Sequence, residues 1–346
     1  DLRMSRGLGD VYKRQEENTE QRVDLTLFSE KIQELKDRIA SVIVGQEQTV
    51  DLVLTAILAN GHVLIEGVPG VAKTLLARLT ARLIDADFSR VQFTPDLMPS
   101  DVLGTTVFNM KTNGFDFHQG PIFADIVLVD EINRAPAKTQ AALFEVMEER
   151  QISIDGTTHR MGDLYTILAT QNPVEQEGTY KLPEAQLDRF LMKITMDYPS
   201  LEEEVNILER HHTNAALVKL DDITPAITKE ELLSLRAFMN QVFVDRTLLQ
   251  YIALIVQQTR TSKAVYLGAS PRASVAMLQS SKAYALLQGR DFVTPEDIKF
   301  VAPYVLQHRL ILTAEAEMEG YSPVKVTQRL IDKVEAVSYT HLTLPT

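Results

Sequence analysis

The chain has 346 residues, of which 45% are apolar and 24% are charged, so its length suits about two domains of ordinary size. Its formal net charge of −12 argues against tight binding to nucleic acid, and the absence of cysteine excludes disulfides and thiolate metal sites. No apolar run is long enough to span a bilayer and the first residues lack a signal-peptide pattern, so we expect a soluble cytoplasmic protein.

The two ends of the sequence differ in character from the rest. Residues 1–15 are mixed, basic and aperiodic, and residues 338–346 replace the last helical pattern with β-branched residues and a proline. We interpret both as non-native segments that resemble translated adapter sequence, with frayed native termini as the alternative.

The first native part of the chain predicts helices and then a sheet. Apolar positions recur at helical spacing over residues 25–59, with a break at 43–45, which indicates two helices around a short loop. Short apolar runs then alternate with helical stretches, a pattern typical of a mainly parallel sheet whose strands are buried on both faces. The runs are 62–65, 90–93, 126–129, 165–169 and 191–196. We therefore predict an α/β domain with a five-stranded sheet over residues 16–198.

Two segments of this domain predict β-hairpins. Apolar residues alternate over 106–117 around Asn113-Gly114 and over 151–160 around Asp155-Gly156. Both dipeptides favour the positive φ angles of a tight hairpin turn. Plain surface loops are the alternative for either segment taken alone.

After Pro199, signals for helix starts repeat and no further strand pattern is visible. Ser200 is followed by Glu203 and Thr228 by Glu231, each at the spacing of a capping box, and Thr294 precedes a proline. We therefore predict an all-helical domain over residues 199–337.

A phosphate-binding loop is predicted between the strand that ends at Ile65 and the helix that begins near Lys73. Backbone N–H groups at a helix N-terminus attract phosphate, Lys73 would reach the β and γ phosphates of ATP, and the Thr74 hydroxyl would bind Mg²⁺. Ala72 stands where such loops usually have glycine, which is compatible with closure if this position is not left-handed. The expected nucleotide-binding residues here are Gly67, Val68, Pro69, Gly70, Val71, Ala72, Lys73, Thr74 and Leu75.

Two acids complete the predicted site. Asp130 and Glu131 follow the apolar run 126–129, and acids at the end of a buried strand are costly unless they have a role there. Asp130 would bind Mg²⁺ through its water shell, and Glu131 would polarise the attacking water. Asn172 ends the next strand and could bind that water or the γ-phosphate; a turn-forming Asn before Pro is the alternative.

These motifs together resemble the MoxR family of AAA+ ATPases. The matching segments are GVPGVAKT, IVLVDEINRAP, LATQNP, LPEAQLDRF and SPRAS, within residues 25–337. The resemblance implies a P-loop AAA+ domain followed by a helical lid, in which alanine before the lysine is usual. It also implies that the two hairpins face a pore or a client. Residues 93–99 resemble a further signature of the family, and both an exposed loop that contacts a client and a packed turn are possible structures for them.

The resemblance extends the site to further residues. Lys73 and Thr74 match the Walker A lysine and hydroxyl, Asp130 and Glu131 the Walker B acids, and Asn172 the first sensor. Arg189 matches the arginine finger that acts on a neighbouring subunit, and Arg272 the second sensor. Val44 and Gly45 match the segment beside the adenine.

For Arg272, Ser270 and Pro271 predict the start of a helix, where a cation is disfavoured unless a phosphate is bound. For Arg189, an ion pair at the surface is the alternative.

The predicted function is magnesium-dependent ATP hydrolysis coupled to remodelling, maturation or activation of partner proteins. The resemblance implies a homo-oligomeric ring, usually a hexamer, with client proteins and partners that carry a von Willebrand factor A domain. Two alternatives are a nucleotide-gated scaffold with little turnover and an MCM-like nucleic-acid motor, against which the net charge argues. The adjacent His211 and His212 point about 100° apart on a helix, so they do not predict a metal site.

Overall fold

The computed structural model describes residues 25–111, 113–172, 180–213 and 223–341, so the predicted non-native segment 1–15 lies outside the described residues. Residues 342–346 also lie outside them, while the last helix continues to His341. The chain forms two compact units, described separately below: one runs from Lys31 to Ser234, and the other combines the residues up to Glu30 with those from Leu235 onward. The domain boundary expected at Pro199 stays a prediction.

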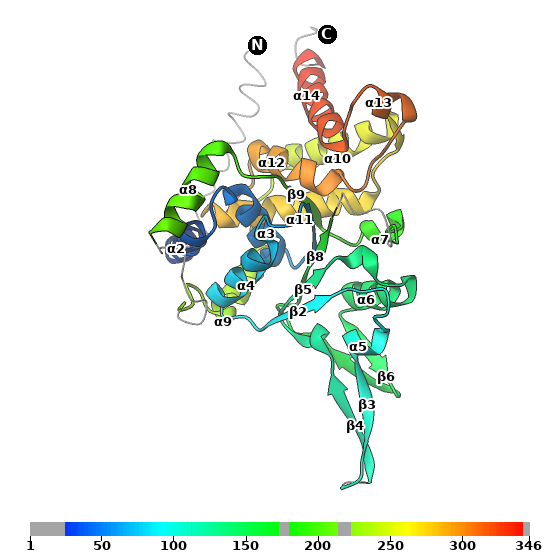
Figure 1. The fold of residues 1–346 in the computed structure, drawn as a ribbon. Coiled ribbons are helices and arrows are strands. Elements are labelled where there is room, and N and C mark those ends of the chain that lie inside the picture. Colours follow the sequence, from blue (N-terminus) through cyan, green and yellow to red (C-terminus); the bar gives the residue numbers. More distant parts are fainter. Residues whose placement is uncertain (1–24, 112, 173–179, 214–222, 342–346) are drawn as a thin grey trace. The chain divides into compact units, whose positions relative to one another are not determined.

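A five-stranded parallel sheet forms the centre of the first unit (Figure 1). Its strand order is β2-β5-β8-β1-β9, and every neighbouring pair is parallel. The strands are β1 (Val63–Gly67), β2 (Phe88–Gln92), β5 (Ile126–Asp130), β8 (Thr166–Gln171) and β9 (Met192–Met196). The five predicted runs overlap these strands, and the parallel arrangement brings all five carboxyl ends to one edge of the sheet.

Helices cover both faces of this sheet, with α3 and α4 on one side and α6 on the other (Figure 1). Strand β5 is buried along its whole length, which explains why its sequence is continuously apolar up to Asp130. The helices are α2 (Thr26–Val42), α3 (Glu47–Leu58), α4 (Lys73–Leu83), α5 (Pro99–Leu103), α6 (Ala137–Glu149), α7 (Glu184–Leu187), α8 (Leu201–His212) and α9 (Lys229–Phe238). Helices α2 and α9 extend across the boundary between the units.

Both predicted hairpins are present: β3 (Gly104–Asn109) pairs with β4 (Gly114–Gln119), and β6 (Gln151–Ile154) with β7 (Thr157–Arg160). Asp155 and Gly156 form the second turn with φ angles of 51° and 79°, as a two-residue turn requires. The first turn differs from the prediction, because Gly114 already pairs with Asn109 and only Asn113 of the dipeptide lies in the loop.

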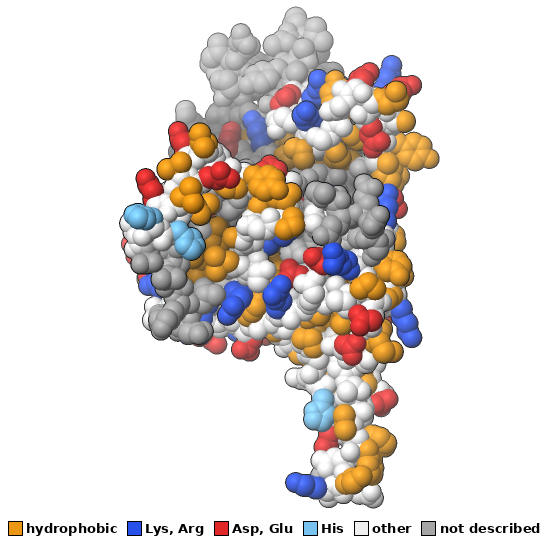
Figure 2. All heavy atoms as spheres, viewed as in Figure 1, with side chains coloured by type: hydrophobic (Ala, Val, Ile, Leu, Met, Phe, Trp, Pro, Cys, Tyr) orange, Lys and Arg blue, Asp and Glu red, His pale blue; other side chains and the backbone are white. Residues whose placement is uncertain are grey.

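The first hairpin projects from the sheet and carries exposed apolar side chains (Figures 1 and 2). Phe108 and Phe115 face each other across the two strands with ring centroids 5.3 Å apart, and both are exposed. Nearer the root, Phe117 packs against His159 of the second hairpin, at 4.3 Å between centroids. The apolar face therefore continues from the root of the hairpin into solvent.

The segment 93–99 forms a packed turn, which is one of its two predicted alternatives. Phe93 is fully buried and Leu97 packs against the same core, while the Leu97 carbonyl accepts a hydrogen bond from Thr139 at 2.7 Å. Met98 and Pro95 of this turn are exposed. The packing fixes the path of the chain from β2 to α5.

The second unit is helical, as expected, with one small exception. Its helices after α9 are α10 (Arg246–Thr261), α11 (Pro271–Leu287), α12 (Pro295–Leu306), α13 (Ala314–Met318) and α14 (Pro323–His341). The expectation of no strand after Pro199 is wrong in one detail, because β10 (Val265–Leu267) pairs with β11 (Ile311–Leu312). Such short strands show no alternation in the sequence. None of the described helices has the length and apolar character needed to cross a membrane.

Candidate active site at the carboxyl edge of the sheet

The loop from Gly67 to Ala72 joins the end of β1 to the start of α4, which begins at Lys73. Gly70 has a φ of +91°, and a Cβ added there would meet no atom within 4 Å. Gly67 is confined instead, because an added Cβ would lie 2.8 Å from the Met196 carbonyl oxygen. The Lys73 ammonium donates a hydrogen bond to the Gly67 carbonyl at 2.5 Å, so the lysine folds back over the loop.

Ala72 is left-handed, so the condition under which the sequence allowed closure with alanine is not met. Its φ is 61° and its ψ is 23°, and it is the N-cap of α4. A left-handed conformation costs a residue with a Cβ roughly 1–2 kcal/mol, which explains why glycine is the usual residue here. The loop closes despite the alanine, at the expense of local strain.

Replacing Ala72 with Gly is expected to stabilise the unit by about 0.5–1 kcal/mol. The substitution removes the strain but adds conformational freedom to the unfolded chain, which offsets roughly 0.4–1 kcal/mol of the gain. The measurement is the free energy of unfolding in urea. Ala77→Gly, in the interior of α4, is the matched control and should lose stability instead. A loss of stability in both variants would contradict the left-handed conformation at Ala72.

Asp130 and Glu131 stand at the end of β5, with their oxygens held by neighbouring side chains. Asp130 is 6% exposed, and its two oxygens contact Arg90 Nε at 2.6 Å and the Thr170 hydroxyl at 3.1 Å. The Glu131 amide also donates to that hydroxyl, at 3.0 Å. Glu131 itself has a φ of +55°, a left-handed conformation that non-glycine residues adopt rarely.

Lys73 and the two acids lie close enough to affect one another electrostatically. Burial lowers the pKa of the Lys73 ammonium, and the carboxylates of Asp130 and Glu131 partly offset this by raising it. The structure therefore brings together the lysine and the two acids that the sequence places about 60 residues apart. Thr74 lies in the first turn of α4, next to this lysine.

The two oxygens of Glu131 have different surroundings. Gln92 Nε2 donates to Oε2 at 2.8 Å, and Arg134 Nε contacts the same oxygen at 3.0 Å. Both contacts use Oε2, and no described residue donates a hydrogen bond to Oε1. This division suits a general base that is held in place by one oxygen.

Four of these neighbours were not predicted from the sequence: Arg90, Gln92, Arg134 and Thr170. Arg90 and Gln92 alternate on β2 and therefore share one face of that strand. Their spacing of two residues, in a strand that runs beside the acids, is the signal that could have identified them. Thr170 lies two residues before the predicted Asn172.

Asn172, Val44 and Gly45 belong to the same unit as the loop. Asn172 follows β8 at the same edge of the sheet and is 8% exposed. Val44 and Gly45 lie in the bend between α2 and α3, where an added Cβ on Gly45 would lie 2.3 Å from the Glu203 carboxylate of α8. The role of all three residues stays a prediction.

The two predicted arginines occupy different units. Arg189 contacts α6 through Glu148 and through the Phe144 carbonyl, within the first unit. Arg272 is the second residue of α11 in the other unit, after Ser270 as N-cap and Pro271. The Ser270 side chain makes no capping hydrogen bond, so this helix start relies on the proline.

The residues at the edge of the sheet fit a nucleotide with magnesium. Thr74 and Asp130 supply the oxygen ligands that Mg²⁺ prefers, and the Gly70 backbone has free space beside it. The described residues hold no group of three or more His, Cys, Asp or Glu that could bind a metal alone. Magnesium that is bound mainly by phosphates and water needs only one or two protein carboxylates, so the donor set is sufficient.

Comparisons with known proteins support the fold and identify the family. Residues 62–192 match the model of the ATPase family associated with various cellular activities (AAA), and residues 257–332 match the AAA lid domain. A putative ATPase from Cytophaga hutchinsonii has a similar solved structure, with 40% identity, a TM-score of 0.82, and coverage of 90% of this chain and 96% of that one.

Curated relatives cover nearly the whole chain. The uncharacterized protein YeaC of Bacillus subtilis is 47% identical, over 86% of this chain and 92% of its own length. Chaperone MoxR1 of Mycobacterium tuberculosis is 44% identical, over 86% of this chain and 80% of its own length. Protein MoxR of Methylorubrum extorquens is 31% identical, over 81% of this chain and 87% of its own length. With a parallel sheet whose carboxyl edge gathers a loop lysine and two acids, and with relatives of this extent, the chain belongs to the MoxR family of AAA+ ATPases.

Proposed function

We propose that this chain binds ATP with Mg²⁺ at the carboxyl edge of the sheet and hydrolyses it to ADP and phosphate. The observation that carries the proposal is the position of Lys73: it stands at the N-terminus of α4, near enough to Asp130 and Glu131 at the end of β5 for electrostatic interaction with both. A cation, a helix N-terminus and paired acids are the groups that phosphoryl transfer requires around a triphosphate.

Each residue then has a distinct task in the reaction. Lys73 leaves the Gly67 carbonyl and neutralises charge on the β and γ phosphates, while the loop N–H groups bind their oxygens. Thr74 and Asp130 would hold Mg²⁺, which would supply further neutralisation of phosphate charge. Glu131 accepts a proton from the attacking water through Oε1, and Asn172 orients that water.

We further propose that the chain works as a ring of identical subunits. Arg189 would act on the ATP of the neighbouring subunit, and Arg272 would sense the γ-phosphate from the lid; both roles rest on the family pattern. Hydrolysis removes the contacts to the γ-phosphate, and the resulting movement would remodel a client protein. The relative named Chaperone MoxR1 and the exposed apolar hairpin β3–β4 support a client of this kind. A six-membered ring, a partner with a von Willebrand factor A domain and a cytoplasmic location remain predictions from the sequence.

The test is calorimetric titration of the purified protein with ATP, in the presence of Mg²⁺ and again with a chelator, combined with phosphate-release kinetics. We expect affinity and turnover that both depend on Mg²⁺. Turnover per subunit should rise with protein concentration, because a finger that acts in trans requires assembly. A protein without Mg²⁺-dependent affinity for ATP would overturn the proposal.

A further inference from the structure

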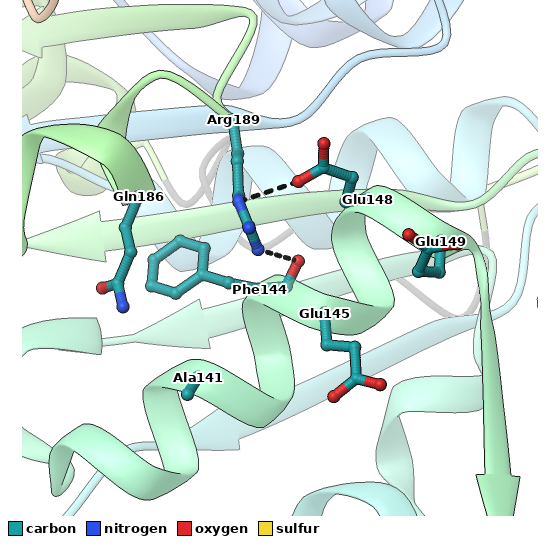
Figure 3. A pocket seen from close by; sticks show the side chains of 7 residues that line it. All are labelled: Ala141, Phe144, Glu145, Glu148, Glu149, Gln186 and Arg189. Carbon is teal, nitrogen blue, oxygen red and sulfur yellow. Dashed lines mark hydrogen bonds and ion pairs between the residues drawn. The ribbon is translucent and has the colours of Figure 1, made fainter.

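Arg189 is docked on helix α6 by two contacts of its guanidinium (Figure 3). Its Nε lies 3.0 Å from the Glu148 carboxylate, and its Nη1 donates a hydrogen bond to the Phe144 carbonyl at 2.8 Å. Phe144 and Glu148 are four residues apart, so both groups lie on one face of the helix. The arginine is therefore held in a defined position by its own subunit.

This position has an acidic environment. Arg189 lines a pocket of about 260 Å³ together with Glu145, Glu148 and Glu149 of α6 and Gln186 of α7. Of the three carboxylates, that of Glu148 points toward the guanidinium, whereas those of Glu145 and Glu149 turn away from it (Figure 3). Because carboxylates repel phosphate, Arg189 cannot bind a γ-phosphate favourably while it stays paired with Glu148 in this pocket.

We propose that Glu148 is a positioning residue that holds Arg189 in a resting place, and that Arg189 reaches a neighbouring subunit's ATP only after this ion pair breaks. The inference rests on the proposed function, in which Arg189 acts in trans. It adds a condition to that function: Arg189 stays paired with Glu148 of its own subunit until a neighbouring subunit presents a more highly charged anion.

The strength of the contact suits such a release. Side chains of Arg189 and Glu148 are 31% and 38% exposed, and an ion pair at this exposure is weak enough to exchange for a more highly charged partner. A triphosphate with several negative charges offers the guanidinium a better bidentate acceptor than one carboxylate does. The resting position is therefore reversible.

The experiment compares Glu148→Gln with Glu145→Gln. Both variants remove one negative charge from the same pocket, but only Glu148 contacts Arg189. The first readout is the rate at which phenylglyoxal modifies Arg189 in dilute protein without nucleotide, measured by mass spectrometry of the modified peptide. We expect the rate to be about two- to fivefold higher in Glu148→Gln than in the wild type and in Glu145→Gln.

The second readout is ATP turnover of the concentrated, assembled protein. Glu148→Gln should raise kcat by about two- to fivefold and leave the KM for ATP unchanged, because the ATP in question is bound by the other subunit's loop. Equal modification rates in the two variants, or a kcat of Glu148→Gln that does not exceed that of Glu145→Gln, would overturn the inference.

Arg189→Ala separates this inference from the function on which it rests. If Arg189→Ala binds ATP but has lost turnover while Glu148→Gln behaves like Glu145→Gln, only the resting position is wrong. If Arg189→Ala keeps normal turnover, the trans role of Arg189 in the proposed function is wrong, and the resting position loses its purpose with it.

Discussion

Replacing Glu131 with Gln is expected to lower ATP turnover by roughly 10²- to 10⁴-fold while ATP binding is retained. Glutamine has the same shape and still accepts hydrogen bonds from Gln92 and Arg134, but it cannot take a proton from water. Lys73, Thr74 and Asp130 are unchanged in this variant, so the affinity for magnesium ATP should stay close to that of the wild type.

The measurements are single-turnover phosphate release and calorimetric titration with ATP. Glu47→Gln, which makes the same change at an exposed position of α3, serves as the control and should turn over like the wild type. A Glu131→Gln variant as active as the wild type would remove Glu131 from the reaction. If the wild type binds ATP but its turnover is as low as that of Glu131→Gln, the result would instead favour the nucleotide-gated scaffold.

The sequence predicted the sheet well because its strands are buried. The run Ile126–Asp130 is apolar up to the acid, and the structure places it in the sheet with every residue buried. Strand β2 was located less accurately, two residues late at its start. It pairs only with β5, at one end of the sheet, and just one of its five residues is buried, so its pattern is mixed.

The residues that the sequence did not identify act through contacts between strands. Arg90 and Gln92 contact Asp130 and Glu131 only because β2 lies beside β5 in the sheet. The contacting residues are about 40 positions apart in the sequence, so the pairing of the two strands cannot be read from local pattern. The left-handed Ala72 was missed for a different reason. A residue with a Cβ is presumed to avoid this conformation, and the closed loop imposes it nevertheless.

His62, at the start of the sheet, gives the largest expected effect of pH on stability. The side chain is 4% exposed, and its Nδ1 accepts a hydrogen bond from the Ile167 amide at 3.0 Å. The other nitrogen, Nε2, lies 3.1 Å from the Met147 carbonyl and therefore carries the proton. A second proton would place an N–H group against the Ile167 N–H, so the structure requires a neutral imidazole.

Burial, followed by the nearby Arg150 guanidinium, lowers the pKa of His62 from 6.5 to about 3. Because the folded pKa lies below the unfolded value, the stabilisation is fully present above about pH 6.5 and is lost as the pH falls toward 3. Between pH 7 and pH 5 the protein should lose about 2 kcal/mol of unfolding free energy through this residue alone.

The expected loss is measured by urea unfolding at a series of pH values, with His62→Gln and His211→Gln compared to the wild type. His62→Gln should be less stable at pH 7, because the Ile167 amide and the Met147 carbonyl lose well-placed partners, but its further loss down to pH 5 should be smaller by about 2 kcal/mol. His211→Gln removes an exposed imidazole of α8 and controls for the loss of one histidine. If the pH dependence of His62→Gln equalled that of the wild type, His62 would not be a neutral imidazole whose two nitrogens form hydrogen bonds to β8 and to the end of α6.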